Sequence, residues 1–188
     1  MTTPTPVRTL TAEEFVQTTD PDGMCSELLF GEVVHLPPAD TEHSYVSGNV
    51  YFALKLFTRM HPELGIATTE GGFIVTRDPD TVRAPDAAWI SAQRAPGGRL
   101  RGYVNGAPNL AVEVVSAGDR DQDVASKIRL WLDAGAERVW EIRPRADTVT
   151  VHTRDGTPLT LGIGDELRSE HAAFPIDGFS LSIALVFE

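Results

Sequence analysis

One short segment in the middle of the chain restricts the fold more than any other feature. Residues 110–115 read Leu-Ala-Val-Glu-Val-Val, an apolar run interrupted by a single carboxylate. A run of this kind is typical of a central strand in a sheet that is covered on both faces. The rest of the chain must therefore supply the strands and helices that bury it.

The segments around this run have the patterns of such covering elements. Apolar residues recur every three or four positions over 41–60, which predicts a helix with one buried face. A second helix is expected over about 121–134, and a capping-box pattern at Thr11 and Glu14 predicts a short early one. Strand-like segments are expected at 66–69, 73–76, 82–90, 138–142, 148–153 and 159–161. This order predicts an α/β or α+β fold, with helices flanking a mixed central sheet and a core at about 41–142.

The two ends of the chain add smaller elements. Two β-prone runs on either side of Gly31 predict an N-terminal hairpin, and the segments after residue 148 predict C-terminal antiparallel strands. Residues 1–9 are expected to be flexible, residues 94–106 to form a mobile loop, and residues 180–187 to form a strand or a helix. With 188 residues, the chain is expected to form a single domain.

Composition limits the partners that the protein can have. The formal net charge is −11, from 27 acidic and 16 basic residues, which disfavours nonspecific binding to phosphate backbones. A nucleic-acid role would need a local basic rim, or metal ions that cancel carboxylates. No apolar run approaches the length of a membrane span, about 18 residues, so a membrane role is excluded. The single cysteine, Cys25, excludes an intramolecular disulfide and favours a reducing compartment, so the cytoplasm is the expected location.

Glu113 and Asp86 are the first candidates for chemistry. Glu113 interrupts the apolar strand, and because a buried carboxylate without a partner costs several kcal/mol, a cation, a donor or a metal should lie near it. An ion pair with an arginine, or a strand exposed on one side, would also explain it. Asp86 follows Pro85 at the start of an apolar strand, where a Pro-Asp pair alone usually marks a turn. Carboxylates on successive strands can converge on a hard cation such as Mg²⁺ or Mn²⁺.

Lys127 is the third candidate. It lies between Val124 and Trp131 on the expected buried side of its helix, and only two of the 16 basic residues are lysines. Because this helix follows the Glu113 strand directly, its inner face can reach the same site. An ammonium there could position an attacking water or stabilise a phosphoryl transition state. The alternative is a lysine whose stem covers the edge of the core.

In their order and spacing, these residues resemble the PD-(D/E)XK nuclease superfamily, and more closely its Uma-two family of restriction endonucleases. The matching positions are Glu27, Leu28, Gly31, Glu32, His43, Pro85, Asp86, 107–110, 113–116, Lys127, Leu130, Gly135, Trp140, Ile142 and 177–179. The resemblance covers roughly residues 10–187 and depends on the set of motifs, since no single one is specific.

The resemblance implies a restriction-endonuclease-like core and a metal-dependent phosphodiesterase. It assigns Asp86 and Glu113 as metal ligands with the main-chain carbonyl of Val114 as a third, Mg²⁺ or Mn²⁺ as the cofactor, and Lys127 as the catalytic lysine. The superfamily's usual Glu-x-Lys pattern would place lysine at position 115, where this chain has Val115. In the Uma-two family the following helix supplies the lysine, which Lys127 matches.

Three further matches are possible accessory residues. Glu32 could be another acidic group near the metal or a solvated hairpin residue. His43 could bind phosphate or hold the start of the first long helix. Glu27 matches the family without a defined role.

Two main hypotheses follow for the function. The first is a Mg²⁺-dependent endonuclease that hydrolyses DNA through a metal-activated water, with Arg94, Arg99 and Arg101 as phosphate contacts. Because superfamily nucleases commonly cut two strands as dimers, a homodimer is expected. The second is an inactive nuclease fold that serves as a binding or dimerisation module, which the net charge of −11 favours. A glycosidase with paired carboxylates is a weaker third interpretation, since aromatic residues make up only 7% of the chain.

Overall fold

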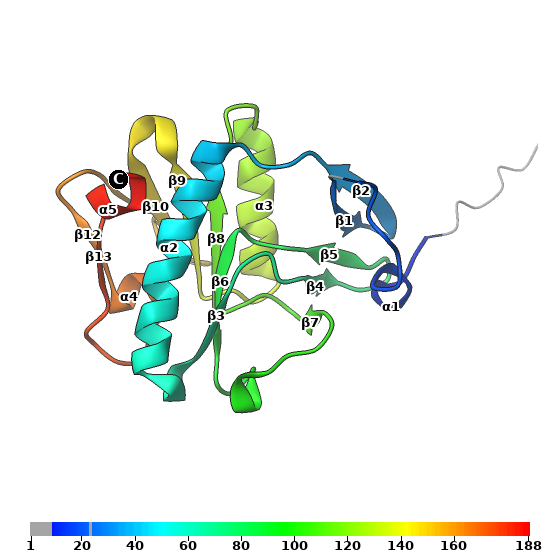
Figure 1. The fold of residues 1–188 in the computed structure, drawn as a ribbon, viewed down its shortest axis with the longest axis horizontal. Coiled ribbons are helices and arrows are strands. Elements are labelled where there is room, and N and C mark those ends of the chain that lie inside the picture. Colours follow the sequence, from blue (N-terminus) through cyan, green and yellow to red (C-terminus); the bar gives the residue numbers. More distant parts are fainter. Residues whose placement is uncertain (1–8, 23) are drawn as a thin grey trace, which may run out of the picture.

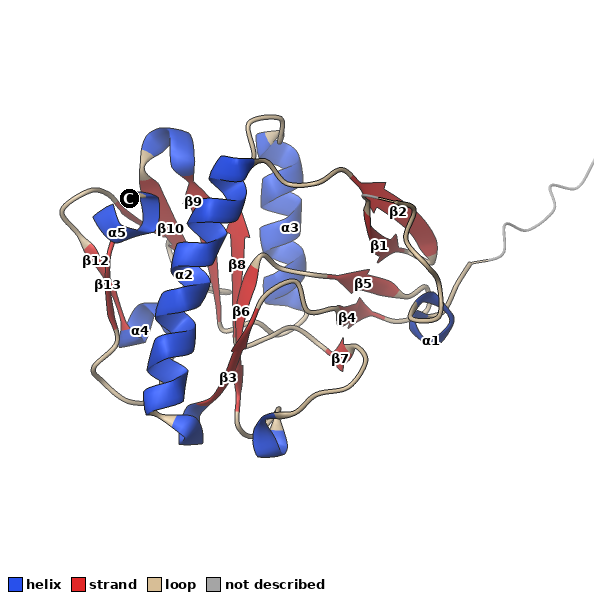
Figure 2. Cartoon of the chain, in the orientation of Figure 1, coloured by secondary structure: helices blue, strands red, loops and turns tan. Residues whose placement is uncertain are grey.

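The computed structural model describes residues 9–22 and 24–188, in which a six-stranded sheet forms the centre (Figures 1 and 2). Its strand order is β11-β10-β9-β8-β6-β3. The strands are β3 (Gly65–Thr68), β6 (Ala87–Ser91), β8 (Leu110–Val114), β9 (Arg138–Arg143), β10 (Thr148–His152) and β11 (Leu159–Leu161). β8 and β9 are parallel and the other neighbours are antiparallel, so the prediction of a mixed sheet is confirmed. The expected flexible N-terminus, 1–9, lies outside the described residues except for its last residue.

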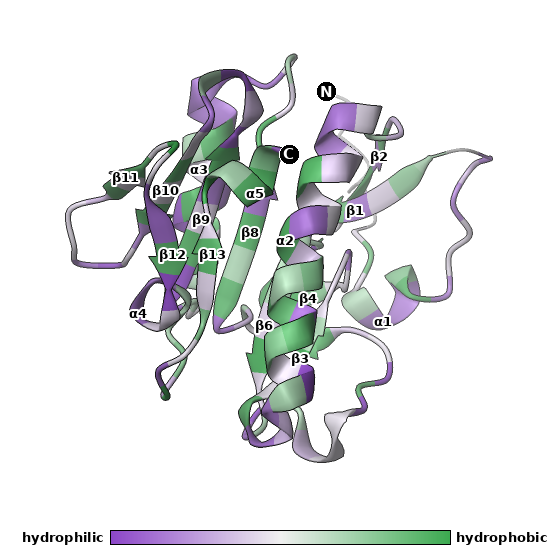
Figure 3. Ribbon diagram, turned by 60° about the vertical axis from the view of Figure 1, so that its left-hand side comes forward, coloured by the Kyte–Doolittle hydropathy of each residue, from purple (hydrophilic) through white to green (hydrophobic). Residues whose placement is uncertain are grey.

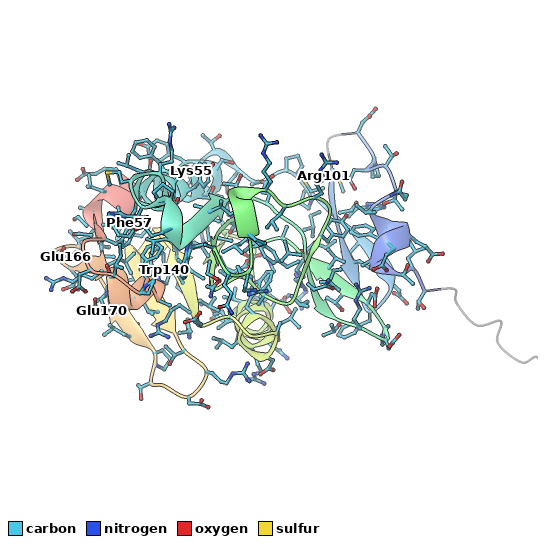
Figure 4. All side chains as sticks on the ribbon, turned by 90° about the horizontal axis from the view of Figure 1, so that it is seen from below. Lys55, Phe57, Arg101, Trp140, Glu166 and Glu170 are labelled. Atoms are coloured by element: carbon cyan, nitrogen blue, oxygen red, sulfur yellow. The ribbon has the colours of Figure 1, made fainter. Side chains whose placement is uncertain are left out.

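Two long helices cover the faces of this sheet, as the periodicity predicts. α2 (Thr41–Met60) lies on one face and α3 (Asp121–Asp133) on the other. All of β8 is buried, and its side chains alternate: Val112 belongs to the apolar cluster beneath α2, and Ala111 to the cluster beneath α3. Phe57 and Trp140, which Figure 4 labels, belong to the cluster beneath α2.

A second sheet lies beside the first, with the order β2-β1-β5-β4-β7. Its strands are β1 (Cys25–Leu29), β2 (Glu32–Leu36), β4 (Phe73–Thr76), β5 (Thr81–Arg83) and β7 (Val104–Asn105). The predicted N-terminal hairpin is confirmed, because β1 and β2 pair along their whole length. α1 (Ala12–Phe15) begins at Thr11 with both hydrogen bonds of the expected capping box.

The prediction of one continuous strand over 82–90 is wrong. The segment divides into β5, in the second sheet, and β6, in the central sheet, at Pro85. Proline has no N–H to donate to a ladder, and here its carbonyl accepts from the Glu70 N–H, outside both sheets. The next residue, Asp86, donates its N–H to the Val112 carbonyl, which begins pairing with β8. Asp86 therefore lies where the chain passes from one sheet to the other.

The C-terminal part contains more elements than the sequence analysis predicts. Residues 180–187 hold both a strand and a helix, β13 (Ser180–Ser182) followed by α5 (Ala184–Phe187). β13 pairs antiparallel with β12 (Glu166–Arg168) in a separate two-stranded sheet, and α4 (Ser169–Ala172) follows β12. Short 3₁₀ helices span Pro62–Leu64, Pro96–Gly98 and Pro144–Ala146. Among the described residues, no helix is both long and apolar enough to cross a bilayer.

Candidate active site

Asp86 and Glu113 lie on neighbouring strands of the central sheet. In the antiparallel pairing of β6 with β8, Ala87 is opposite Val112, so Asp86 comes beside Glu113. Asp86 Oδ2 accepts a hydrogen bond of 2.6 Å from the Val114 N–H. This bond fixes the Asp86 carboxylate against the carboxyl end of β8, near the first turns of α2 in Figure 1.

His43 reaches the same carboxylate from α2. Its main-chain N–H donates to Asp40 Oδ1 at 2.8 Å, which caps the helix, and its Nε2 lies 3.3 Å from Asp86 Oδ2. The hydrogen bond to Asp86 raises the pKa of His43, although burial acts against it. His43 Nδ1 is buried with no hydrogen-bond partner among the described residues. His43 therefore lies beside Asp86, at the start of α2.

Glu113 has two partners, both from α3. Its Oε1 accepts a hydrogen bond of 2.6 Å from the Trp131 indole N–H, and its Oε2 lies 3.5 Å from Lys127 Nζ. A cation, a donor or a metal is expected beside this carboxylate, and the structure provides the first two; no arginine of the described residues pairs with it. The donor from Trp131 was not predicted.

The electrostatics of this pair follow from its burial. Glu113 is only 7% exposed, and burial, together with the Asp86 charge, raises its pKa to about 7 despite the opposing effect of Lys127 and the Trp131 N–H. In turn, the Glu113 carboxylate raises the pKa of Lys127. The lysine side chain is 35% exposed, so it connects the buried carboxylate with solvent.

A second ion pair, between Glu27 and Arg83, borders the same site. Glu27 Oε2 accepts from Arg83 Nη1 at 2.7 Å, and Glu27 Oε1 lies 3.4 Å from the Ala84 N–H. Both charges act on Lys127, which places the pair close to the catalytic candidates. Arg83 Nε is buried without a hydrogen-bond partner in the described part of the chain. Arg83 was not predicted from the sequence, where its one signal is its position just before the Ala-Pro-Asp turn.

Other predicted residues lie outside this group. Glu32 is exposed beside the hairpin turn, where Gly31 donates to the Asp80 carbonyl, and it is paired with Leu29, whereas Glu27 is paired with Val34 in the middle of the hairpin. Arg94 donates to the carbonyls of Asn105 and Ala107, at the amino end of β8, and burial lowers its pKa.

The other two predicted phosphate contacts, Arg99 and Arg101, belong to the same loop as Arg94 and are exposed. Arg101 lies on the side of the molecule away from Glu166 and Glu170 (Figure 4). This loop lies at the amino end of β8, whereas Glu113 lies near the carboxyl end of the same strand. A nucleic acid would therefore have to extend along the molecule to contact both the loop and Glu113.

The donor set fits a hard cation that keeps several water ligands. Among the described residues, no group of three or more His, Cys, Asp or Glu side chains is arranged to hold a metal ion. The two carboxylates of Asp86 and Glu113, with a main-chain oxygen, are nevertheless the kind of set that binds Mg²⁺, which is usually held by one or two carboxylates and water.

Comparison with known proteins shows the family to which the chain belongs. The family model described as Uma2, putative restriction endonuclease, matches residues 12–184. The chain belongs to the Uma2 family. The fold of this Uma2 chain is shared by a crystal structure of a putative nuclease belonging to DUF820 from Anabaena variabilis ATCC 29413, with a TM-score of 0.77 and 20% identity. The match covers 95% of this chain and 97% of that one. No curated protein matches the Uma2 chain.

Proposed function

We propose that this protein is a metal-dependent endonuclease, active in the cytoplasm as a single-domain subunit, that hydrolyses DNA phosphodiester bonds through a metal-activated water. The observation that carries the proposal is the convergence of Asp86 and Glu113 at the end of the central strand, with Lys127 beside Glu113. Membership of the Uma2 family and the fold shared with a putative nuclease support the same function.

Each residue of the site has a separate role in the proposed reaction. Asp86, Glu113 and the main-chain carbonyl of Val114 would hold Mg²⁺ or Mn²⁺. When bound, such an ion lowers the pKa of a water ligand and neutralises charge on the scissile phosphate. Lys127 Nζ, partly exposed and fixed by Glu113, orients the attacking water or donates to a phosphate oxygen in the transition state. His43 holds Asp86 in place.

The cations of the site explain how DNA could bind to a chain whose net charge is negative. Arg83, Lys127 and His43 accompany the carboxylates of Glu27, Asp86 and Glu113, so the site itself is close to neutral before a metal binds. A bound divalent ion would make it positive, and DNA could bind there despite a formal charge of −11. We also propose a homodimer, because one site cuts one strand at a time.

One observation favours the alternative, a nuclease fold that only binds or dimerises. Asp86 Oδ2 is already engaged by His43 and by the Val114 N–H, so this oxygen has its partners without a metal. A single assay distinguishes the nuclease from the binding module. Purified protein is incubated with supercoiled, linear and single-stranded DNA in EDTA, Mg²⁺ or Mn²⁺, and metal binding is followed by calorimetry. We expect cleavage with either metal and none in EDTA. Inert protein that binds no metal would support the binding module.

Arg83 provides a test of DNA binding that needs no catalysis. The double variant Glu27→Gln with Arg83→Ala removes both charges of the buried pair, so no unpaired charge is left behind. We expect its affinity for duplex DNA, measured by fluorescence anisotropy in EDTA, to fall about tenfold because a guanidinium binds phosphate through paired donors. Glu27→Gln alone, which keeps Arg83, should bind DNA at least as tightly as the wild type. Equal affinity of the double variant and the wild type would exclude Arg83 as a phosphate contact.

A further inference from the structure

The outward side of α2 carries an exposed apolar face that the proposed chemistry does not use. Tyr45, Phe52, Leu56 and Met60 are 54%, 68%, 47% and 62% exposed, and Leu185 of α5 is 56% exposed. These five make up half of the large exposed hydrophobic residues in the described chain. Single exposed apolar residues are ordinary, but a contiguous group marks an interaction surface.

These residues form one surface because α5 packs against α2. Asn49 Nδ2 donates to the Val186 carbonyl at 3.2 Å, and the Tyr45 hydroxyl donates to the carbonyl of Glu188. Leu185 thus lies on the element that borders the exposed side of the long helix. In Figure 3, α2 lies in front of the sheet, and no other element of the described chain covers the side turned to the viewer.

The helix has apolar stripes on two sides. Val46, Val50 and Leu54 recur at four-residue intervals and face the central sheet, where they are buried. Tyr45 and Phe52, seven residues apart, lie on the other side. One stripe is explained by the fold of a single chain, whereas the other needs a second partner.

The charges along α2 indicate what that partner is. Asp40 and Glu42 stand at the start of the helix, and Lys55 and Arg59 stand toward its end; Lys55 projects from its surface in Figure 4. A second α2 that runs antiparallel to the first brings the acidic end of each helix beside the basic end of the other. The helix is therefore complementary in charge to its own copy.

A single register satisfies the apolar and the charged residues together. When Asn49 of one helix is opposite Phe52 of the other, Tyr45 is opposite Leu56, and Glu42 is opposite Arg59. Gly48 lies on the same side, and no atom lies within 4 Å of the position that its Cβ would take, so a second helix backbone has room to approach. Every contact occurs twice, as a two-fold axis requires.

We propose that this face, formed by α2 and α5, is the two-fold interface between two copies of the chain, with the α2 helices antiparallel. This face would be the interface of the homodimer proposed above. The inference therefore rests on the proposed dimerisation and not on the proposed DNA cleavage. Oligomeric state and DNA cleavage are measured separately, so either can fail without the other.

The first test compares two phenylalanines of similar exposure by sedimentation velocity over a range of protein concentrations. Phe52 is 68% exposed on α2, and Phe30 is 63% exposed at the hairpin turn. We expect wild type and Phe30→Glu to form dimers with the same dissociation constant, and Phe52→Glu to weaken the dimer about tenfold or more, as for a central apolar contact. A wild type that stays monomeric, or a dimer that Phe52→Glu leaves unchanged, overturns the proposal.

The second test addresses the antiparallel register. Glu42→Arg and Arg59→Glu each place like charges opposite one another, so each should weaken the dimer. The double variant, which carries both changes, restores opposite charges and should recover most of the wild-type affinity. Failure of the double variant to recover any affinity overturns the antiparallel arrangement. Circular dichroism checks that each variant keeps its helices.

Discussion

Replacement of Asp86 by Asn is expected to reduce metal-dependent DNA cleavage by at least about 10³-fold, because a metal ion in such a site contributes several kcal/mol. The amide keeps the size of the carboxylate and an oxygen that can accept from the Val114 N–H, so β6 and β8 remain paired. The variant loses the charge that would attract the ion. The measurement is the rate of plasmid nicking at saturating Mg²⁺, together with calorimetric titration of the metal.

Lys127→Ala is the matched comparison for Asp86→Asn. This variant keeps both carboxylates, so we expect metal binding to persist while cleavage falls about 10²-fold or more, the usual effect of removing a group that stabilises transition-state charge. Asp86→Asn should instead lose both metal binding and cleavage. Wild-type cleavage by Asp86→Asn, with its metal affinity unchanged, would show that this carboxylate is not a ligand.

The parts of the fold that follow from sequence are those in which local pattern and tertiary packing agree. The helix expected over 41–60 forms at those residues because its apolar spacing matches the face that it buries, and Asp40 caps it. The strand that contains Glu113 is central because its composition suits burial on both faces. The order of these elements, which carries the family resemblance, was therefore predictable.

The parts that could not be predicted depend on long-range pairing. The segment 82–90 has strand character on both sides of Pro85, and nothing local shows that its halves belong to different sheets. The same limit applies to the site: the sequence indicates that Glu113 needs a partner, but the choice of Trp131 depends on how α3 lies across the sheet. The ion pair between Glu27 and Arg83 joins two strands that are far apart in the chain, so the sequence near either residue does not indicate its partner.

The outer face of α2 illustrates a related limit. A stripe of apolar residues at helical spacing predicts burial, but it does not distinguish the interior of one chain from an interface between two. Phe52 and Phe57 are equally apolar in sequence, yet Phe57 is 4% exposed and Phe52 68% exposed. Only the position of α2 on the sheet separates the core residue from the residue that we assign to an interface.

Glu113→Gln is expected to change the pH dependence of stability in EDTA. In the folded protein the pKa of Glu113 is raised to about 7 from 4.5, chiefly by burial. Between these values the folded state holds a proton that the unfolded chain has lost, so the free energy of unfolding falls as pH rises from about 4.5 to about 7. Glutamine cannot ionise, so at pH 8 the variant should be more stable than the wild type by about 1–3 kcal/mol, and at pH 4 nearly equal to it.

Urea unfolding at several pH values checks this prediction, and Glu141→Gln is its control. Glu141 is opposite Glu113 on β9 and equally buried, but hydrogen bonds from His152 and Arg143 lower its pKa. Its contribution to stability is present above the unfolded pKa and is lost as pH falls, so Glu141→Gln should destabilise the protein at pH 7. Adding Mg²⁺ at pH 8 should stabilise the wild type and Glu141→Gln, because the ion favours the ionised Glu113, and should leave Glu113→Gln unchanged. An equal response of all three proteins to Mg²⁺ would place the metal elsewhere.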